Sequence, residues 1–173
     1  MTAIFDEIEH ALKTGLYYLA VSTAVTLPDI CSALEQPDAR AHHTLYKEWY
    51  KIWVSKLYPQ ITDLDMYCIR CGIVHTGNFG HPGCQYSRIV FTVPEFGVSL
   101  HCGILQTSQM AAQGVAHVLT LDTTMFCRDI VGSARTWLDE NKNNSVVQNN
   151  MDRIVRLRPN GFLPYIDGLP VIA

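Results

Sequence analysis

The sequence predicts a mainly α-helical protein, a bundle of four or more helices with a small antiparallel β-hairpin or sheet inserted at about residues 86–121. Two patterns indicate this fold class. Apolar residues recur at spacings of three and four before and after the insertion, which is the period of a helix with one buried side. Within the insertion they alternate with polar residues, as in a half-buried strand. We expect one domain over residues 1–173, because a chain of this length builds one well-buried core.

The first three predicted helices follow from their apolar stripes and end signals. A stripe from residue 3 to about residue 20 predicts the first helix. Pro28 and Asp29 suit the first turn of a short second helix, because proline lacks an N–H that would be unpaired there and aspartate complements the positive helix end. Asp38 is expected to cap a longer, aromatic-rich helix that ends near Leu57.

The fourth predicted helix contains the stretch YCIRCGIVHTG at residues 67–77. Thr62 followed by Asp65 has the form of an N-terminal cap, and an apolar pattern of helical period continues to a terminator at Gly77. The stretch is therefore expected to be a buried helix.

The second half of the chain is expected to begin with strands and to end with helices. Alternating residues predict strands at 88–93 and 98–105, joined as a β-hairpin, and a third strand at 116–121. Helices are predicted at 122–140 and 146–157. The apolar tail that follows is expected to pack on the core or on a second subunit.

The composition excludes several classes of protein. Apolar residues make up 48% and charged residues 17%, which is typical of a globular chain and not of a disordered one. A formal net charge of −3 provides no overall basic field, so a nucleic-acid function would have to rest on a local site. The acidic start MTAIFDEIEHALKTG lacks the features of a signal peptide. We therefore expect a cytoplasmic protein that makes no membrane contact, with its six cysteines reduced.

One interpretation of residues 67–84 is a zinc site. Cys68, Cys71, His81 and Cys84 are ligands of the types that zinc prefers, and Gly72 suits the turn of a zinc knuckle. The local pattern favours another interpretation, because the two first cysteines lie in a continuous helical stretch and cysteines three apart share one helix face. Such thiols are commonly small buried apolar groups. We expect no cofactor, with zinc as the alternative.

The other interpretation is a catalytic pair of Arg70 and His75. Arginine binds phosphate through a fork of donors, and histidine exchanges protons near neutral pH, so the two together suit RNA cleavage without a metal. Five positions on a straight helix turn through about 140° beyond a full turn, so the pair needs a long arginine reach or a second copy of the helix across a two-fold axis. A purely structural interpretation has Arg70 reaching a carboxylate such as Asp29 or Asp65, with His75 as a helix-terminal donor.

The residues Arg70-Cys-Gly-Ile-Val-His75, late in a helix of a helical bundle, resemble the Arg-x4-6-His motif of HEPN domains (higher eukaryotes and prokaryotes nucleotide-binding). The flanking stretches PDICSALE and YKEWYKIWV resemble a group of small prokaryotic HEPN-like proteins. The resemblance implies a helical bundle that forms a homodimer through the motif helices. It also implies a metal-independent endoribonuclease, often of a toxin–antitoxin or anti-phage system with a neutralising partner protein.

By this resemblance Arg70 and His75 are the catalytic residues and RNA is the substrate. Asp29 and Cys71 are candidates for substrate binding or support of the site; the position of Cys71 is often polar in active members. Two alternatives stay open, namely a non-catalytic HEPN-like module that binds a nucleotide, RNA or a protein, and a small zinc-stabilised domain.

Overall fold

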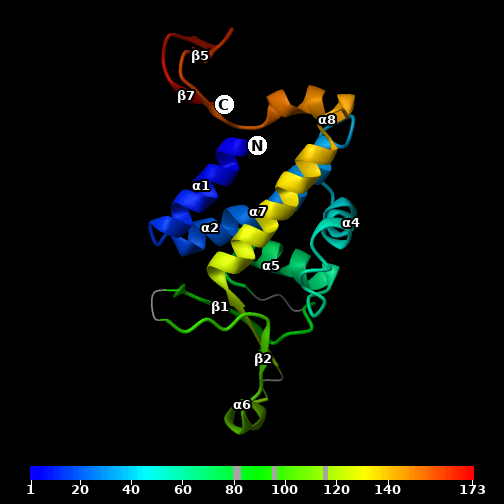
Figure 1. Ribbon diagram of the computed structural model, residues 1–173, viewed down its shortest axis with the longest axis vertical. Helices are drawn as coiled ribbons and strands as arrows, with labels where there is room; N and C mark the ends of the chain where they lie inside the picture. The colour runs from blue at the N-terminus through cyan, green and yellow to red at the C-terminus, as the bar shows by residue number, and fades with distance from the viewer. Residues whose placement is uncertain (80–82, 95–96, 115–116) are drawn as a thin grey trace.

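The computed structural model describes residues 1–79, 83–94, 97–114 and 117–173. It confirms a mainly helical fold with small sheets. The helices form the body, a three-stranded sheet lies at one end, and the C-terminal segment extends from the other end (Figure 1). The described α-helices are α1 (Thr2–Lys13), α2 (Tyr17–Ala24), α3 (Leu27–Leu34), α4 (His43–Trp53), α5 (Asp63–Thr76), α6 (Ser108–Ala112), α7 (Thr123–Glu140) and α8 (Ser145–Asn150).

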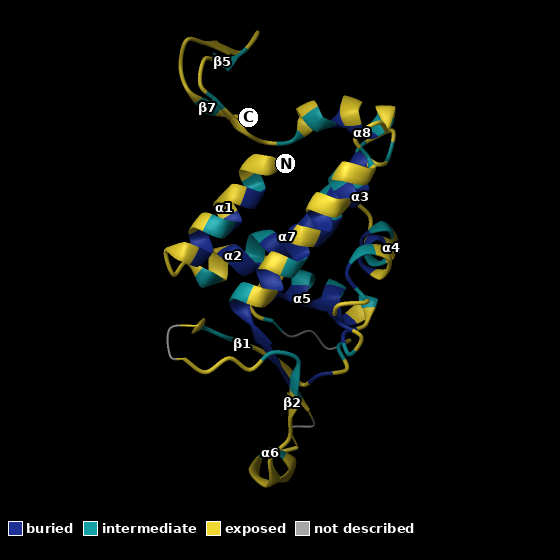
Figure 2. Ribbon diagram, in the orientation of Figure 1, coloured by how far each residue is buried: buried dark blue, intermediate teal, exposed yellow. Residues whose placement is uncertain are grey.

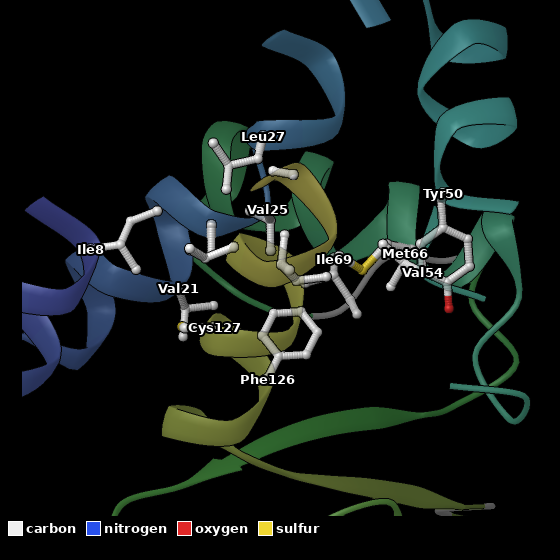
Figure 3. Packing of buried hydrophobic residues seen from close by; sticks show 14 of the residues in the cluster. Ile8, Val21, Val25, Leu27, Tyr50, Val54, Met66, Ile69, Phe126 and Cys127 are labelled. Carbon is white, nitrogen blue, oxygen red and sulfur yellow. The ribbon is translucent and has the colours of Figure 1, made fainter. Parts of the chain in front are cut away.

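Helix α7 is the central element of the body and packs against α1, α2, α3 and α4. Its inward side chains Phe126, Ile130 and Trp137 are fully buried, as the helical period predicts. Figure 3 shows Phe126 among apolar side chains of α1, α2 and α5, including Ile8, Val21 and Ile69. Burial of these side chains is the main stabilising contribution to such a fold, and it fixes α3 and α5 relative to each other.

Four predicted helix boundaries are wrong, and one of them is the end of the aromatic-rich helix, which lies at Trp53 and not near Leu57. The first helix is divided into α1 and α2, because Gly15 adopts a left-handed φ of +74° and turns the chain while the apolar stripe continues. Helix α4 begins after His42, whose Nδ1 accepts a hydrogen bond from the Thr44 N–H at 3.3 Å, and not after Asp38. Helix α8 ends at Asn150, where a 3₁₀ turn (Met151–Arg153) leads the chain away.

The inserted sheet consists of β1 (Arg88–Thr92), β2 (Gly103–Leu105) and β3 (Val118–Asp122) in the order β1-β3-β2. Strand β1 is parallel to β3 and β2 is antiparallel to it, so the sheet is mixed. The predicted hairpin between the first two strands is therefore wrong. Strand β3 takes the middle because its Leu119 and Leu121 are fully buried, whereas Ile104 of β2 is exposed.

The C-terminal segment forms an arm, residues 155–173, that pairs with itself. Its two ladders join β4 (Leu157–Arg158) to β7 (Val171–Ile172) and β5 (Gly161–Phe162) to β6 (Ile166–Asp167). Figure 2 shows most of the arm exposed and away from the helical body. The expectation that the tail packs on the core is therefore wrong, and its packing on a second subunit stays a prediction. No helix in the described part of the chain is long and apolar enough to cross a membrane.

Candidate functional site

Helix α5 is built by the end signals that the sequence contains. The Thr62 Oγ1 accepts a hydrogen bond from the Asp65 N–H at 3.1 Å, and the Asp65 carboxylate accepts one from the Thr62 N–H at 3.0 Å, which is a capping box. Gly77 ends the helix with a left-handed φ of +68°. Asp65 is fully buried and also accepts a bond from the Gln85 N–H at 2.8 Å, so it is occupied structurally.

Arg70 projects from α5 towards the first turn of α3. Its Nε donates a hydrogen bond to the Asp29 carboxylate at 2.6 Å, and the two side chains are only 22% and 13% exposed. Of the two carboxylates considered from the sequence, Arg70 therefore pairs with Asp29. The ion pair fixes one edge of the guanidinium group and leaves its Nη atoms for other partners.

The structure brings Arg70 and His75 together within one chain. The Arg70 Nη1 and the His75 Nε2 are 3.4 Å apart, although the two residues leave the helix in different directions. The length of the arginine side chain closes the angular gap, so a second subunit is not required for this contact. Arginine has donors alone, so a hydrogen bond here uses the lone pair on Nε2 and places the imidazole proton on Nδ1.

Burial and ion pairing have opposite effects on the pKa values of Arg70 and Asp29. Burial raises the pKa of the Asp29 carboxyl, and the hydrogen bond and charge of Arg70 oppose that rise. Burial lowers the pKa of the Arg70 guanidinium, but the hydrogen bond and charge of Asp29 outweigh this effect and leave that pKa raised. Arg70 is therefore a charged donor at every physiological pH.

Cys71 also belongs to this cluster. Its thiol raises the pKa of the Tyr67 hydroxyl and contributes to the raised pKa of the Arg70 guanidinium, so it lies beside both groups. The Tyr67 ring in turn contacts the rings of His43 and Tyr46, at centroid distances of 6.2 and 5.4 Å. Lys47 lies 5.5 Å over the Tyr67 ring.

Three further neighbours of the site, Tyr67, His43 and Lys47, were not predicted from the sequence. Tyr67 lies three and four positions before Arg70 and Cys71, so its place on the same helix face could have been inferred from spacing. His43 and Lys47 come from α4, and no local signal places them there.

The cysteines of the zinc interpretation divide between two surroundings. Burial raises the pKa of the Cys68 thiol and the neighbouring Cys84 opposes that rise, whereas Cys71 lies beside Arg70 and Tyr67. His81, the fourth predicted ligand, lies outside the described residues, so the four-ligand site stays a prediction. Among the residues that the structure describes, no group of three or more histidine, cysteine or acidic side chains could hold a metal ion.

Comparison with protein-family models gives no match for this chain, and comparisons with curated proteins and with solved structures give none either. The function must therefore be inferred from the residues of the site.

Proposed function

We propose that this chain is a metal-independent endoribonuclease of the HEPN type that acts as a homodimer. The observation that supports this proposal best is the contact of Arg70 Nη1 with His75 Nε2 at 3.4 Å, in a cluster where Asp29 holds the arginine. An anchored guanidinium beside a histidine provides an anion-binding fork and a proton acceptor at one point.

The chemistry follows from the roles of the two side chains. A bound phosphate draws the Arg70 Nη1 away from His75, which frees the Nε2 lone pair. His75 Nε2 then takes the proton of an RNA 2′-hydroxyl, and the 2′-oxygen forms a bond to the adjacent phosphorus. Arg70 stabilises the negative charge that develops on the phosphoryl oxygens. The bond from phosphorus to the 5′-oxygen then breaks, and that oxygen receives a proton, for which the second His75 of a dimer is suited. The products are a 2′,3′-cyclic phosphate and a 5′-hydroxyl.

The outer surface of α5 supports a dimer at the motif helix. His75 is exposed, and Val74 beside it is 48% exposed although it is apolar. Leu64, near the other end of the same helix, is also exposed. Two copies of α5 that meet at Val74 would bring two Arg70–His75 pairs to one cleft on the two-fold axis.

Cleavage of mixed cellular RNA in EDTA tests the proposal. Wild type should cleave, and His75→Ala should lose cleavage with little change in thermal stability, because His75 is exposed. His10→Ala, which changes an exposed histidine on α1, is the matched control and should cleave like wild type. Equal cleavage by wild type and His75→Ala would refute the proposal.

A binding module without turnover is the second candidate. The feature that favours it is the Asp29 carboxylate, 2.6 Å from Arg70, which compensates the charge that would attract a phosphate. RNA that is bound but never cleaved by wild type, with weaker binding by Arg70→Ala, would support this candidate against the nuclease.

A further inference from the structure

A groove with an apolar floor and several polar side chains lies between the end of α4 and the middle of α7, and it is separate from the residues of the Arg70 cluster. Its volume is 370 Å³, which is within the usual range for small-molecule sites of about 300–1,000 Å³. The turn after α4 forms one wall and one face of α7 forms the other. The lining residues are Trp53, Lys56, Leu57, Arg128, Asp129, Gly132, Ser133 and Thr136.

The hydroxyl of Ser133 is the first indication of a ligand. Ser133 is only 8% exposed and lines the groove, and within the described residues its side chain has no hydrogen-bond partner. The Ser133 oxygen is open to the groove, because it is not one of the fully buried polar atoms that lack a partner in the described part of the chain. It can therefore donate to or accept from a ligand there.

Gly132 is the second indication. It lies in the interior of α7, where glycine is less favourable to the helix than alanine. A Cβ added at this position would meet no atom within 4 Å, so close packing does not require the glycine. Gly132 lines the groove, so a larger side chain at this position would take up part of the space in it.

The charges and rings of the groove define the chemistry of the ligand. Lys56 makes no ion pair with any described residue, and Arg128 uses its Nε and Nη2 for Glu9 and leaves Nη1. These cations suit a phosphate group. The half-buried Trp53 offers a ring on which a base can stack.

Asp129 and Thr136 provide hydrogen-bond acceptors for the sugar of such a ligand. The Asp129 carboxylate accepts a hydrogen bond from the Tyr58 hydroxyl through Oδ2 at 2.7 Å, which orients the group and leaves Oδ1 to accept from a sugar hydroxyl. The Thr136 hydroxyl donates to the Gly132 carbonyl at 3.1 Å and keeps its acceptor capacity. From this arrangement we infer that the groove binds a nucleoside monophosphate unit, either as a free nucleotide or as one residue of an RNA strand.

Titration with AMP tests the inference. Wild type should bind AMP at millimolar concentration and bind adenosine about tenfold more weakly, since adenosine lacks the phosphate. Lys56→Gln should weaken AMP binding about tenfold and Ser133→Ala several-fold, whereas Lys142→Gln, at an exposed lysine outside the groove, should leave it unchanged.

Gly132→Leu separates a binding role from a structural one. The leucine should fill the groove and abolish AMP binding while the midpoint of thermal unfolding rises by a few degrees, because leucine favours the helix. Retained AMP affinity in a folded Gly132→Leu protein would overturn the inference, and so would affinity that is unchanged in Lys56→Gln.

Two ligand sources give different results in the His75→Ala protein, which should not cleave RNA. Binding of AMP but not of a short RNA oligomer identifies a free nucleotide, and the reverse identifies a strand; both outcomes support the groove. Wild type that binds neither ligand would overturn it. His75 does not line the groove, so AMP binding is independent of the proposed cleavage.

Discussion

Arg70 and Asp29 are 41 positions apart in the chain, and the Nε of the one donates to the carboxylate of the other at 2.6 Å. This bond joins the C-terminal half of α5 to the first turn of α3. It sets the direction of the guanidinium group, whose Nη1 then lies 3.4 Å from His75. In the proposed cleavage Asp29 is therefore a positioning residue, because its contact is with Arg70.

If Asp29 positions Arg70, replacing Asp29 should change the kcat of RNA cleavage. Asp29→Ala should lower kcat for RNA cleavage by about 10–100-fold with a small change in KM, because a displaced Arg70 loses contacts made in the transition state. Asp29→Glu should recover part of the loss. The unfolding free energy of Asp29→Ala should fall by about 1–3 kcal/mol, since Arg70 loses its partner in a mostly buried setting.

A matched control for this prediction is Asp63→Asn. Asp63 pairs with Lys51 at 3.2 Å near the start of α5 and is far along the helix from Arg70. It should leave both kcat and KM unchanged. Full activity in Asp29→Ala would contradict the positioning role.

The contribution of Asp122 to the stability of the folded state should depend on pH. Burial raises the pKa of Asp122, but hydrogen bonds from the Met125 N–H and the Ser99 hydroxyl outweigh it, so that pKa lies below its usual 3.8. The pKa is depressed in the folded state, so the stabilisation is complete above pH 3.8 and is lost as the pH falls from there through the folded-state pKa.

Denaturant melts of wild type and Asp122→Ala at several pH values check this assignment. Asp122 caps α7, so the alanine variant should be about 1–2 kcal/mol less stable at neutral pH. The difference should shrink in acid, where wild type also loses the charged cap. A difference that stays constant down to pH 2 would show that the charge of Asp122 contributes nothing.

Asn150 stabilises the end of α8, so its replacement should lower the free energy of unfolding. Its Nδ2 donates to the carbonyl groups of Leu34 at 3.0 Å and of Gln36 at 2.8 Å, and the side chain is buried. Asn150→Ala removes the side-chain donor of both carbonyl groups, although the Gln36 carbonyl keeps its bond from the Ala39 N–H at 3.0 Å. The change should cost about 1–3 kcal/mol in unfolding free energy. Asn149→Ala, at the exposed neighbouring position, should cost less than about 0.5 kcal/mol. Equal effects of the two changes would contradict the assigned bonds.

Local signals made much of the fold predictable. The capping residues Thr62 and Asp122 and the terminator Gly77 lie where helices begin and end in the structure, because caps satisfy backbone groups within a few residues. A predicted helix boundary was wrong where the apolar stripe continued through a turn, as at Gly15. The predicted order of the strands was wrong, because alternation of apolar and polar residues indicates a strand but not which strand lies beside it in the sheet.

The candidate site was predictable in part. The spacing of Arg70 and His75 identified these two residues as candidates for the site. A bond from Arg70 to Asp29 was predictable as one possibility, because the two side chains carry opposite charges. The 3.4 Å contact depends on the reach of one side chain, which periodicity does not describe. The groove at Gly132 could not be foreseen, because it forms between α7 and a turn more than 70 positions earlier, as the 71-residue separation of Tyr58 and Asp129 shows.

The chemical nature of the ends of the RNA products tests the central claim most directly. RNA treated with purified protein in EDTA is analysed by mass spectrometry for its new termini. The proposal predicts 2′,3′-cyclic phosphates and 5′-hydroxyls from wild type and no new termini from His75→Ala. Products with 3′-hydroxyls and 5′-phosphates, or cleavage that persists in His75→Ala, would contradict it.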